Sequence, residues 1–507
     1  MNDTLATGEK KAAGLIWAYC FLVASVILLI CSKSSPFYPI NDWTDANIYF
    51  SMGKGMAEGQ VIYRDLYDHK GPLLYGLHAI CTLFFSDSFL GVWIMEALAG
   101  AFFLYFAWKT IALNGCGKVA LFCLPVLAML IFSSFSFLHG DSAEELCLPL
   151  LMSALYYWMR YEKETCFTHM PLKIVFWQGF FAGCILWVKF SMLGLHGMWI
   201  FLLFVYLAAQ GKWREAWKTA FWFSLGMAVA TLPWVIYFAA KGAMVPWLKT
   251  YLYDNLFLYS GSEPGLGLLG AGKMAVKTAW EWFAQNLRYT LFIAGGLFWM
   301  LGQREKTVRG KISILLLLGF SALGAFIGGK EYPYYGLILS VFAVFGGIPL
   351  CSLFARWGKN LCSKGLRVAL MVLVSILSLG GAYSLSLNVP QSFLTPKENT
   401  MQYQLAAIMV KTPGATLLNY GFMDSGFYLA ARITPHLKYF HQTNVPLQEM
   451  LDEQMRYVEE GLADYVVTRG KQPENILLLY DCVAEAEAPA WFWYPKVYLY
   501  RLKTLAP

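Results

Sequence analysis

Residues 13–31, AGLIWAYCFLVASVILLIC, form an apolar run of about nineteen residues, close to the ~20 that an α-helix needs to cross a bilayer. Similar runs recur through the first 390 residues. Only 14% of the 507 residues are charged, whereas a soluble chain carries roughly 25%. With a mean hydropathy of +0.49, the sequence predicts a polytopic integral membrane protein.

The first apolar run follows a polar stub that contains Lys10 and Lys11. The run is longer than the ~7–15 residue core of a signal peptide, and no clear cleavage site follows it. We therefore expect an uncleaved first membrane span. Further apolar segments are expected at about 71–86, 88–111, 118–138, 145–160, 173–190, 193–209, 217–240, 288–302, 311–328, 334–354 and 366–388.

Short basic loops separate many of these segments, and such loops are typically cytoplasmic. The net charge of +7 is thus a topology signal and predicts no nucleic-acid partner. If all the segments crossed, the basic loops could not all lie on one side. Segment 71–86 is short and begins with Gly71-Pro72, so we expect it not to cross, which leaves about eleven transmembrane helices. The clearest basic loops contain Lys109/Lys118, Arg160/Lys163/Lys173, Lys212/Arg214/Lys218, Arg304/Lys306/Arg309/Lys311 and Arg356/Lys359/Lys364/Arg367.

This topology puts loop 32–87, turn 139–144, loop 241–287, turn 329–333 and the tail on the outer side. Residues 389–507 alternate β-like runs at Ala415–Asn419, Tyr465–Thr468 and Lys496–Tyr500 with helical stretches at Gln402–Lys411 and Leu447–Glu460. The pattern predicts a small extracytoplasmic α/β domain. It would follow a membrane domain, residues 1–388, that includes the first outer loop.

The first outer loop carries the first candidate catalytic residues. Asn41 or Asp42 is expected to cap a short amphipathic helix lying in the membrane interface. On that helix Asp42, Asp45 and Tyr49 would share one face. Asp42 could be only a cap and Asp45 only a first-turn acid. Because a second acidic cluster is expected on the same side, Asp45 is also a candidate general base.

The second cluster lies in FLHGDSAEELCLP, where one span ends and the next begins. It contains His139, Asp141, Glu144 and Glu145. Helix capping by Asp141 or Ser142 is the plain alternative, but carboxylates at membrane depth are usually functional. Together with Asp45, Glu144 is also a candidate ligand for a hard divalent cation.

Cationic residues on the same side could bind a phosphate or pyrophosphate by charge-assisted hydrogen bonds. The plain alternatives are snorkelling for Lys189 and interface anchoring for the tyrosines. The candidate phosphate ligands are Arg64, Lys70, Lys189 and Lys330, with Asp65, Asp68, His69, Tyr334 and Tyr335 beside them.

The order of these features resembles the GT-C superfamily of membrane glycosyltransferases, especially bacterial members of the protein-mannosyltransferase and aminoarabinose-transferase type. The likeness covers about residues 1–390, and its most specific piece is Tyr63 to Leu74, YRDLYDHKGPLL. The Asp-x-x-Asp at 42–45 departs from the adjacent acidic pair of several relatives, so either Asp42 or Asp45 could be the base.

The resemblance implies an enzyme of the plasma membrane that takes a sugar from a polyprenyl-phosphate carrier and passes it to an envelope acceptor on the outer face. Asp45 is then similar to the family's catalytic base, and Asp141, Glu144 and Glu145 stand at its second acidic motif. Lys189 and Lys330 stand where members hold lipid phosphate. No cofactor is certain, because relatives differ in metal dependence.

Two other readings compete with an enzyme. A lipid or glycan transporter or flippase would also hold charges near its spans, although transporters favour midplane sites and repeated halves. A non-catalytic assembly or sensor protein would use mainly its soluble tail. The sugar and the acceptor are not specified by the sequence.

Overall fold

The computed structural model describes residues 2–259, 268–304, 306–358, 364–470, 472–490 and 494–503. Within these ranges, the side chains of residues 2–11, 118, 268, 269, 271, 357, 358 and 364 are not described. The chain forms two compact units. The first contains Met1–Ser32, Trp93–Pro233 and Gly265–Gln391, and the second contains Lys33–Val92, Trp234–Pro264 and Ser392–Pro507.

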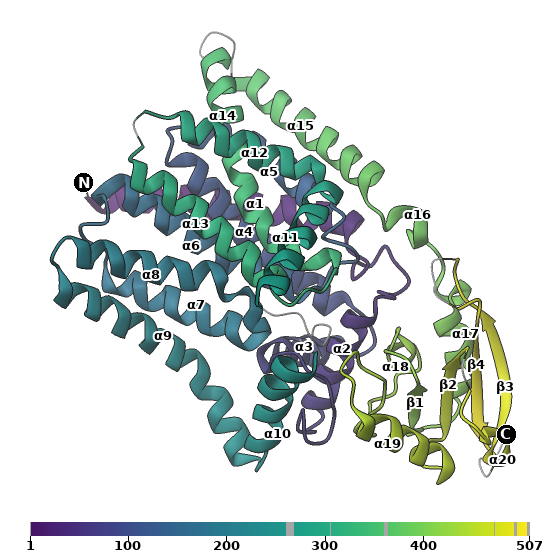
Figure 1. Ribbon diagram of the computed structural model, residues 1–507. Helices are drawn as coiled ribbons and strands as arrows, with labels where there is room; N and C mark the ends of the chain where they lie inside the picture. Colours follow the sequence, from purple (N-terminus) through teal and green to yellow (C-terminus); the bar gives the residue numbers. More distant parts are fainter. Residues whose placement is uncertain are drawn as a thin grey trace. The chain divides into compact units, whose positions relative to one another are not determined.

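The first unit is a bundle of apolar helices (Figure 1). By length and composition, seven stretches of the described chain could cross a membrane, and one of these, Leu172–Ala209, contains two helices joined by a short turn. The helices of the bundle are α1 (Asn2–Cys31), α4 (Leu90–Ala112), α5 (Gly117–Phe132), α6 (Ala143–Thr165), α7 (Leu172–Lys189), η1 (Phe190–Leu193), α8 (Gly194–Ala209), α9 (Trp213–Ala240, whose last residues belong to the second unit), α11 (Leu268–Gln285), α12 (Leu287–Gly302), α13 (Val308–Phe326), η3 (Pro333–Ala343), α14 (Val344–Gly358) and α15 (Lys364–Leu385).

The basic loops meet at one end of this bundle. Lys163 donates to the carbonyl oxygen of Leu113, and Lys212 donates to that of Thr168 at 2.9 Å. Lys306 contacts Glu162 at 3.2 Å. Loops that are far apart in the sequence therefore lie together, as the predicted topology requires of its cytoplasmic loops.

Polar contacts hold the opposite helix ends together. Ser136, after α5, donates to Asn286, before α12, at 2.8 Å. Asn388, after α15, donates to the carbonyl oxygens of Cys31 at 2.6 Å and Leu138 at 2.8 Å. The candidate acidic cluster follows Leu138 directly, so it lies at this end, away from the basic loops.

The second unit contains α2 (Thr44–Ala57) and α3 (Pro72–Phe84), which pack against each other. A Cβ atom at Gly53 would lie 2.5 Å from the Cβ atom of His78, so the two backbones approach where only glycine fits. The 13 residues of α3 extend about 20 Å, less than the ~30 Å of a bilayer core. This length favours the prediction that segment 71–86 does not cross.

The expected amphipathic face of α2 is absent, because every residue from Asp45 to Gly55 is buried. A helix buried on all sides is surrounded by protein. The predicted amphipathic helix in the membrane interface is instead a helix whose residues Asp45 to Gly55 are covered by protein. The local spacing correctly indicated a helix, but it could not show how much of the chain would cover it.

The tail folds around a four-stranded sheet in the order β1-β2-β4-β3 (Figure 1). The pair β1–β2 is parallel, and β2–β4 and β3–β4 are antiparallel. The predicted runs at 415–419, 465–468 and 496–500 correspond to β1 (Leu417–Tyr420), β2 (Tyr465–Arg469) and β4 (Lys496–Leu502), and the missed strand is β3 (Tyr480–Glu487). The helices are α17 (Met401–Met409), α18 (Phe427–Ala430), α19 (Gln448–Glu459) and α20 (Ile476–Leu479), with η4 at Lys397–Asn399.

The first outer loop contributes to the core of the tail. Tyr67 is buried in the same hydrophobic cluster as Leu418 and Val466, and its N–H donates to the carbonyl oxygen of Lys438 at 2.9 Å. Gln60 donates to the carbonyl oxygen of Pro435 at 2.7 Å. The sequence-based division at residue 388 follows the chain, whereas the compact units group residues by contact.

The predicted class, a mainly α-helical polytopic membrane protein with a small α/β domain near its C-terminus, is confirmed. The structure contains both features that define this class, the long apolar helices and the four-stranded sheet. Two short helices of the second unit, α10 (Met244–Leu248) and η2 (Lys249–Tyr259), follow α9.

Candidate active site

Asp45 lies in the first turn of α2 and is buried. Its Oδ2 accepts a hydrogen bond of 3.1 Å from the hydroxyl of Tyr49, one helical turn later. The helix begins at Thr44, where the partial positive charge of the helix N-terminus stabilises a carboxylate. The carboxylate of Asp45 is thus fixed in orientation by Tyr49 and by the helix itself.

The capping role considered for Asp42 was wrong. The residue at the N-cap is Trp43, without a side-chain cap, and Asn41 instead accepts from the N–H of Trp43 at 3.1 Å. Asp42 lies outside the helix and contacts Lys33 at 2.6 Å. It therefore does not continue the helical face of Asp45.

Arg64 and Asp65 form part of a tight turn rather than an open cationic site. Arg64 contacts Asp65 at 2.7 Å and donates to the carbonyl oxygen of Lys241 at 2.8 Å. Asp65 accepts from the N–H of Val61 at 2.8 Å, and Tyr63 has a positive φ of 70°. These contacts fold the loop back on itself, so both side chains stabilise this turn.

Asp68 and His69 form a buried polar pair. Asp68 lies 3.3 Å from Nδ1 of His69 and also accepts from the hydroxyl of Tyr75. Burial opposes the charge of Asp68, but the contact with His69 and the nearby Lys70 outweigh it and hold the pKa of Asp68 below its usual value. The pKa of His69 is lowered, mainly by burial and next by the charge of Lys70. The carboxylates of Asp68 and Asp45 raise it by less. Asp45 is therefore close enough to affect the pKa of His69, a residue of the YRDLYDHKGPLL segment.

Lys70 lies beside an aromatic wall. Its ammonium is 5.9 Å from the ring centre of Tyr259, and the same ring contacts His69 at a centroid distance of 4.7 Å. Asn255 fixes this turn by donating to the carbonyl oxygen of His69 at 2.6 Å. Asp68, His69 and Lys70 are thus brought together with η2, a proximity that the sequence alone did not indicate.

His441, which sequence reasoning did not select, is fully buried in the same unit. Burial lowers the pKa of His441 to about 4. In the unfolded chain a histidine takes up a proton below pH ~6.5, so the stabilising contribution of neutral His441 is present above this pH and is lost as pH falls toward 4. Burial raises the pKa of Asp424 to about 6, which has the opposite effect over an overlapping range.

We therefore expect His441→Gln to reduce acid sensitivity when compared within an Asp424→Asn background. The dependence of the unfolding free energy on pH should fall by up to about 1.4 kcal/mol per pH unit between pH 6.5 and 4. Thermal unfolding of the full chain in detergent measures this. His436→Gln, at an exposed position, is the control, and equal pH slopes for the two variants would contradict the prediction.

The second acidic cluster is built around the start of α6. Ser142 caps the helix by accepting from the N–H of Glu145 at 3.0 Å, which confirms one of the two caps considered. The N–H of Asp141, where φ is 62°, donates to Glu145 at 2.9 Å and to Glu96 at 2.8 Å. Ser32 donates to both carboxylate oxygens of Glu96.

Glu96 belongs to this cluster, although the sequence did not select it as a candidate. It is fully buried in α4. Its contacts with Ser32 and Asp141 join the end of α1 and the start of α6. The available signal was its occurrence as an ionisable residue within an apolar helix, which is itself a functional hint.

Lys189 and Glu144 form a buried ion pair. The Nζ atom of Lys189, at the end of α7, lies 2.5 Å from Oε1 of Glu144, with side-chain exposures of 13% and 1%. The same ammonium is 3.4 Å from the ring centre of Tyr335 and 5.5 Å from that of Tyr334. Snorkelling alone does not describe Lys189, because its charge is held by a carboxylate and two aromatic rings.

The remaining candidates lie in the first unit. His139 lies 2.8 Å from the side-chain oxygen of Asn388, and Lys330 is half-buried in the turn before η3. Asp45 belongs to the second compact unit and Glu144 to the first. Among the described residues, no group of three or more His, Cys, Asp and Glu side chains could hold a metal ion. The divalent cation stays a prediction.

No protein-family model matches the sequence. Curated protein sequences give no match either. Solved structures do match. ArnT from Cupriavidus metallidurans bound to undecaprenyl phosphate is 14% identical, with a TM-score of 0.58 over 97% of this chain and 98% of that chain.

The apo form of the same ArnT gives 14% identity and a TM-score of 0.60 over 98% of both chains. The archaeal oligosaccharyltransferase AglB from Archaeoglobus fulgidus, in complex with an inhibitory peptide and a dolichol-phosphate, is 13% identical, with a TM-score of 0.46 over 91% of this chain and 70% of that chain. The two ArnT structures match the membrane helices and the tail together, since almost the whole chain is covered. This chain therefore shares the fold of ArnT from Cupriavidus metallidurans.

Proposed function

We propose that this protein is a glycosyltransferase that moves a sugar from a polyprenyl-phosphate carrier to an envelope acceptor at the outer face of the plasma membrane. The observation that carries the proposal is the fold shared with an ArnT that binds undecaprenyl phosphate, over 97% of this chain. Fold alone does not specify function. The proposal therefore also rests on the acidic and cationic residues described above.

The charge distribution supports an outer active site. The basic loops gather at one end of the helical unit, and by the positive-inside rule that end faces the cytoplasm. Glu96, Asp141, Glu144 and Glu145 lie at the other end. A lipid-linked sugar in the outer leaflet would meet this acidic end.

In the proposed reaction, Asp45 accepts the proton of an acceptor hydroxyl as that oxygen attacks the anomeric carbon of the sugar. The bond between this carbon and the phosphate oxygen breaks, and the polyprenyl phosphate leaves with the electron pair. Lys70, Lys189 and Lys330 are the proposed cations that stabilise its growing negative charge. A single in-line displacement would invert the anomeric centre.

The pairing of Lys189 defines its proposed role more closely. With Glu144 at 2.5 Å, part of the lysine's charge is already balanced. A carboxylate that holds a lysine also fixes where its ammonium lies, which favours positioning over free electrostatic attraction. A divalent cation at Glu144 would have to share this carboxylate with Lys189, so we propose the metal-free arrangement first.

The transporter or flippase alternative predicts polar groups near the bilayer midplane. The acidic cluster instead begins at the first turn of α6 and at the ends of α1 and α7. This position favours an enzyme working at a membrane surface. A non-catalytic sensor would give no reason for a buried carboxylate set in the membrane unit.

Mass analysis of envelope glycans and lipid-linked sugars, with and without this protein, tests the proposed function. Without the protein, we expect one sugar to disappear from an envelope glycan, lipid or protein and its polyprenyl-phosphate donor to accumulate. Adding the purified protein and the accumulated donor to membranes should restore the transfer. Unchanged envelope sugars and unchanged donor levels would refute the proposal.

A further inference from the structure

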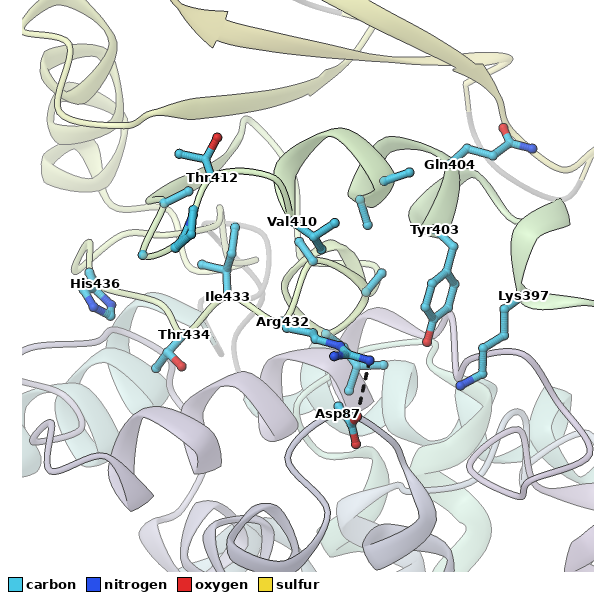
Figure 2. A pocket seen from close by; sticks show the side chains of 18 of the residues that line it. Asp87, Lys397, Tyr403, Gln404, Val410, Thr412, Arg432, Ile433, Thr434 and His436 are labelled. Atoms are coloured by element: carbon cyan, nitrogen blue, oxygen red, sulfur yellow. Dashed lines mark ion pairs between the residues drawn. The ribbon is translucent and has the colours of Figure 1, made fainter. Parts of the chain in front are cut away.

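A cavity of about 1040 Å³ lies within the second unit, between the residues that follow α2 and α3 and the start of the tail (Figure 2). Its volume is at the upper end of the ~300–1,000 Å³ usual for small-ligand sites. The polar residues that line it include Glu58, Asp87, Lys397, Glu398, Tyr403 and Arg432. None of them has a role in the transfer proposed above.

Arg432 lies at one side of this cavity, with its side chain 72% exposed. Its backbone has a positive φ of 58°, which is rare for a residue with a side chain. Its guanidinium lies 3.6 Å from Asp87, and its carbonyl oxygen accepts from Lys54 at 3.2 Å. In Figure 2 the guanidinium points toward Asp87 and toward the side of the cavity that carries Tyr403.

Groups that donate and groups that accept hydrogen bonds both line the cavity. Glu58 accepts from the hydroxyl of Thr434 at 2.7 Å, and the ammonium of Lys397 lies 5.4 Å from the ring centre of Tyr403. The hydroxyl of Tyr403 and the ammonium of Lys397 both point toward the Asp87–Arg432 pair in Figure 2. The wall therefore combines an aromatic ring with groups that donate and groups that accept hydrogen bonds.

We propose that this cavity binds uncharged sugar units of the acceptor, an inference that rests on the proposed glycosyltransferase function. A sugar hydroxyl both donates and accepts hydrogen bonds, so it can use carboxylates and cationic groups together. A phosphorylated ligand would meet the carboxylates of Glu58, Asp87 and Glu398. These three carboxylates outnumber the two cations that line the cavity, Lys397 and Arg432, which leaves an anion little net attraction.

The test measures sugar binding by the full-length protein, immobilised in detergent. The probe is the pool of oligosaccharides that mild acid releases from the envelope of the expressing cells, separated by anion exchange into uncharged and anionic fractions. Retained sugars are identified by mass spectrometry. The variants are Tyr403→Ala and the milder Glu398→Gln, and the control is Tyr494→Ala, an exposed tyrosine of the tail that does not line the cavity.

We expect wild type and Tyr494→Ala to retain the uncharged fraction and Tyr403→Ala to retain about tenfold less, the effect of losing about 1.4 kcal/mol of binding free energy. Glu398→Gln should lower retention without changing the melting temperature, so a folding defect cannot explain the loss. Equal retention by all variants, retention of the anionic fraction alone, or no retention by wild type would each overturn the inference.

Release of polyprenyl phosphate from the donor is measured separately. Cavity variants should raise the KM for the acceptor and leave kcat unchanged, because the cavity contributes binding and no reacting group. If wild type retains sugars but releases no polyprenyl phosphate, the transfer proposal fails and the sugar site stands. If transfer proceeds and the cavity variants retain as much sugar as wild type, the cavity inference alone fails.

Discussion

Replacing Asp45 by Asn is expected to lower the rate of sugar transfer by about 10²- to 10⁴-fold, the usual contribution of a positioned general base. Asparagine has nearly the same size, and its side-chain oxygen can still accept the 3.1 Å hydrogen bond from Tyr49. It cannot take the proton of an acceptor hydroxyl. The melting temperature should therefore change little while turnover is lost, which detergent-solubilised protein and a radiolabelled lipid-linked donor can measure.

Asp42→Asn is the matched control. Asp42 is three residues away and paired with Lys33 at 2.6 Å, so its replacement should leave most of the transfer rate. Tyr49→Phe separates orientation from proton transfer, because it removes the hydrogen bond and keeps the carboxylate. If Asp42→Asn abolishes transfer and Asp45→Asn does not, Asp42 is the base. If transfer continues with Asp45 and Glu144 both replaced, the enzyme proposal fails.

Lys189→Met is expected to destabilise the protein by about 3–5 kcal/mol, the effect of removing one partner from a buried ion pair. Glu144 would remain with a side-chain exposure of 1% and without the ammonium that lies 2.5 Å away. The contacts of this ammonium with Tyr335 and Tyr334 would be lost as well. Denaturant unfolding of the full chain in detergent provides the measurement.

The double variant Lys189→Met/Glu144→Gln should recover much of the lost stability, because no unpaired charge then remains. Lys218→Ala is the surface control: its pair with Glu215 is 43% and 47% exposed, and such pairs contribute about 0–1 kcal/mol. Transfer activity should stay low in the double variant if Lys189 also serves the donor phosphate. Equal stability losses for Lys189→Met and Lys218→Ala would refute the buried-pair account.

Residue patterns along the chain were sufficient to predict the long apolar helices, the tail strands β1, β2 and β4, and the cap at Ser142. Each depends on neighbours close in sequence, such as apolar residues over a span or a serine three residues before a glutamate. These patterns did not predict α10, η2 and α11, which lie in the segment 241–287 that was expected to be a loop. Strand β3 was missed because half of its residues are exposed and charged side chains interrupt its alternation. Its partner β4 contributes the pairing that makes it a strand.

The contacts of the candidate site residues could not be read from the sequence, for one common reason. Asp42 was read as a helix cap because local spacing allowed it, whereas Lys33 holds it outside the helix. Glu96 had no visible partner because Ser32 and Asp141 lie 64 and 45 positions away. Arg64 looked free to bind phosphate, but Asp65 and Lys241 engage it.

The sequence by itself determined that the chain lies in a membrane and which loops are basic, because the hydrophobic effect and the cost of moving charges into lipid act on each segment according to its composition. The tertiary structure decided which charges meet. Lys189 contacts Glu144 although 45 positions in the sequence separate them, and Tyr67 packs in the core of the tail. Electrostatic and packing energies depend on distance in space, and sequence separation gives no measure of that distance until the chain has folded.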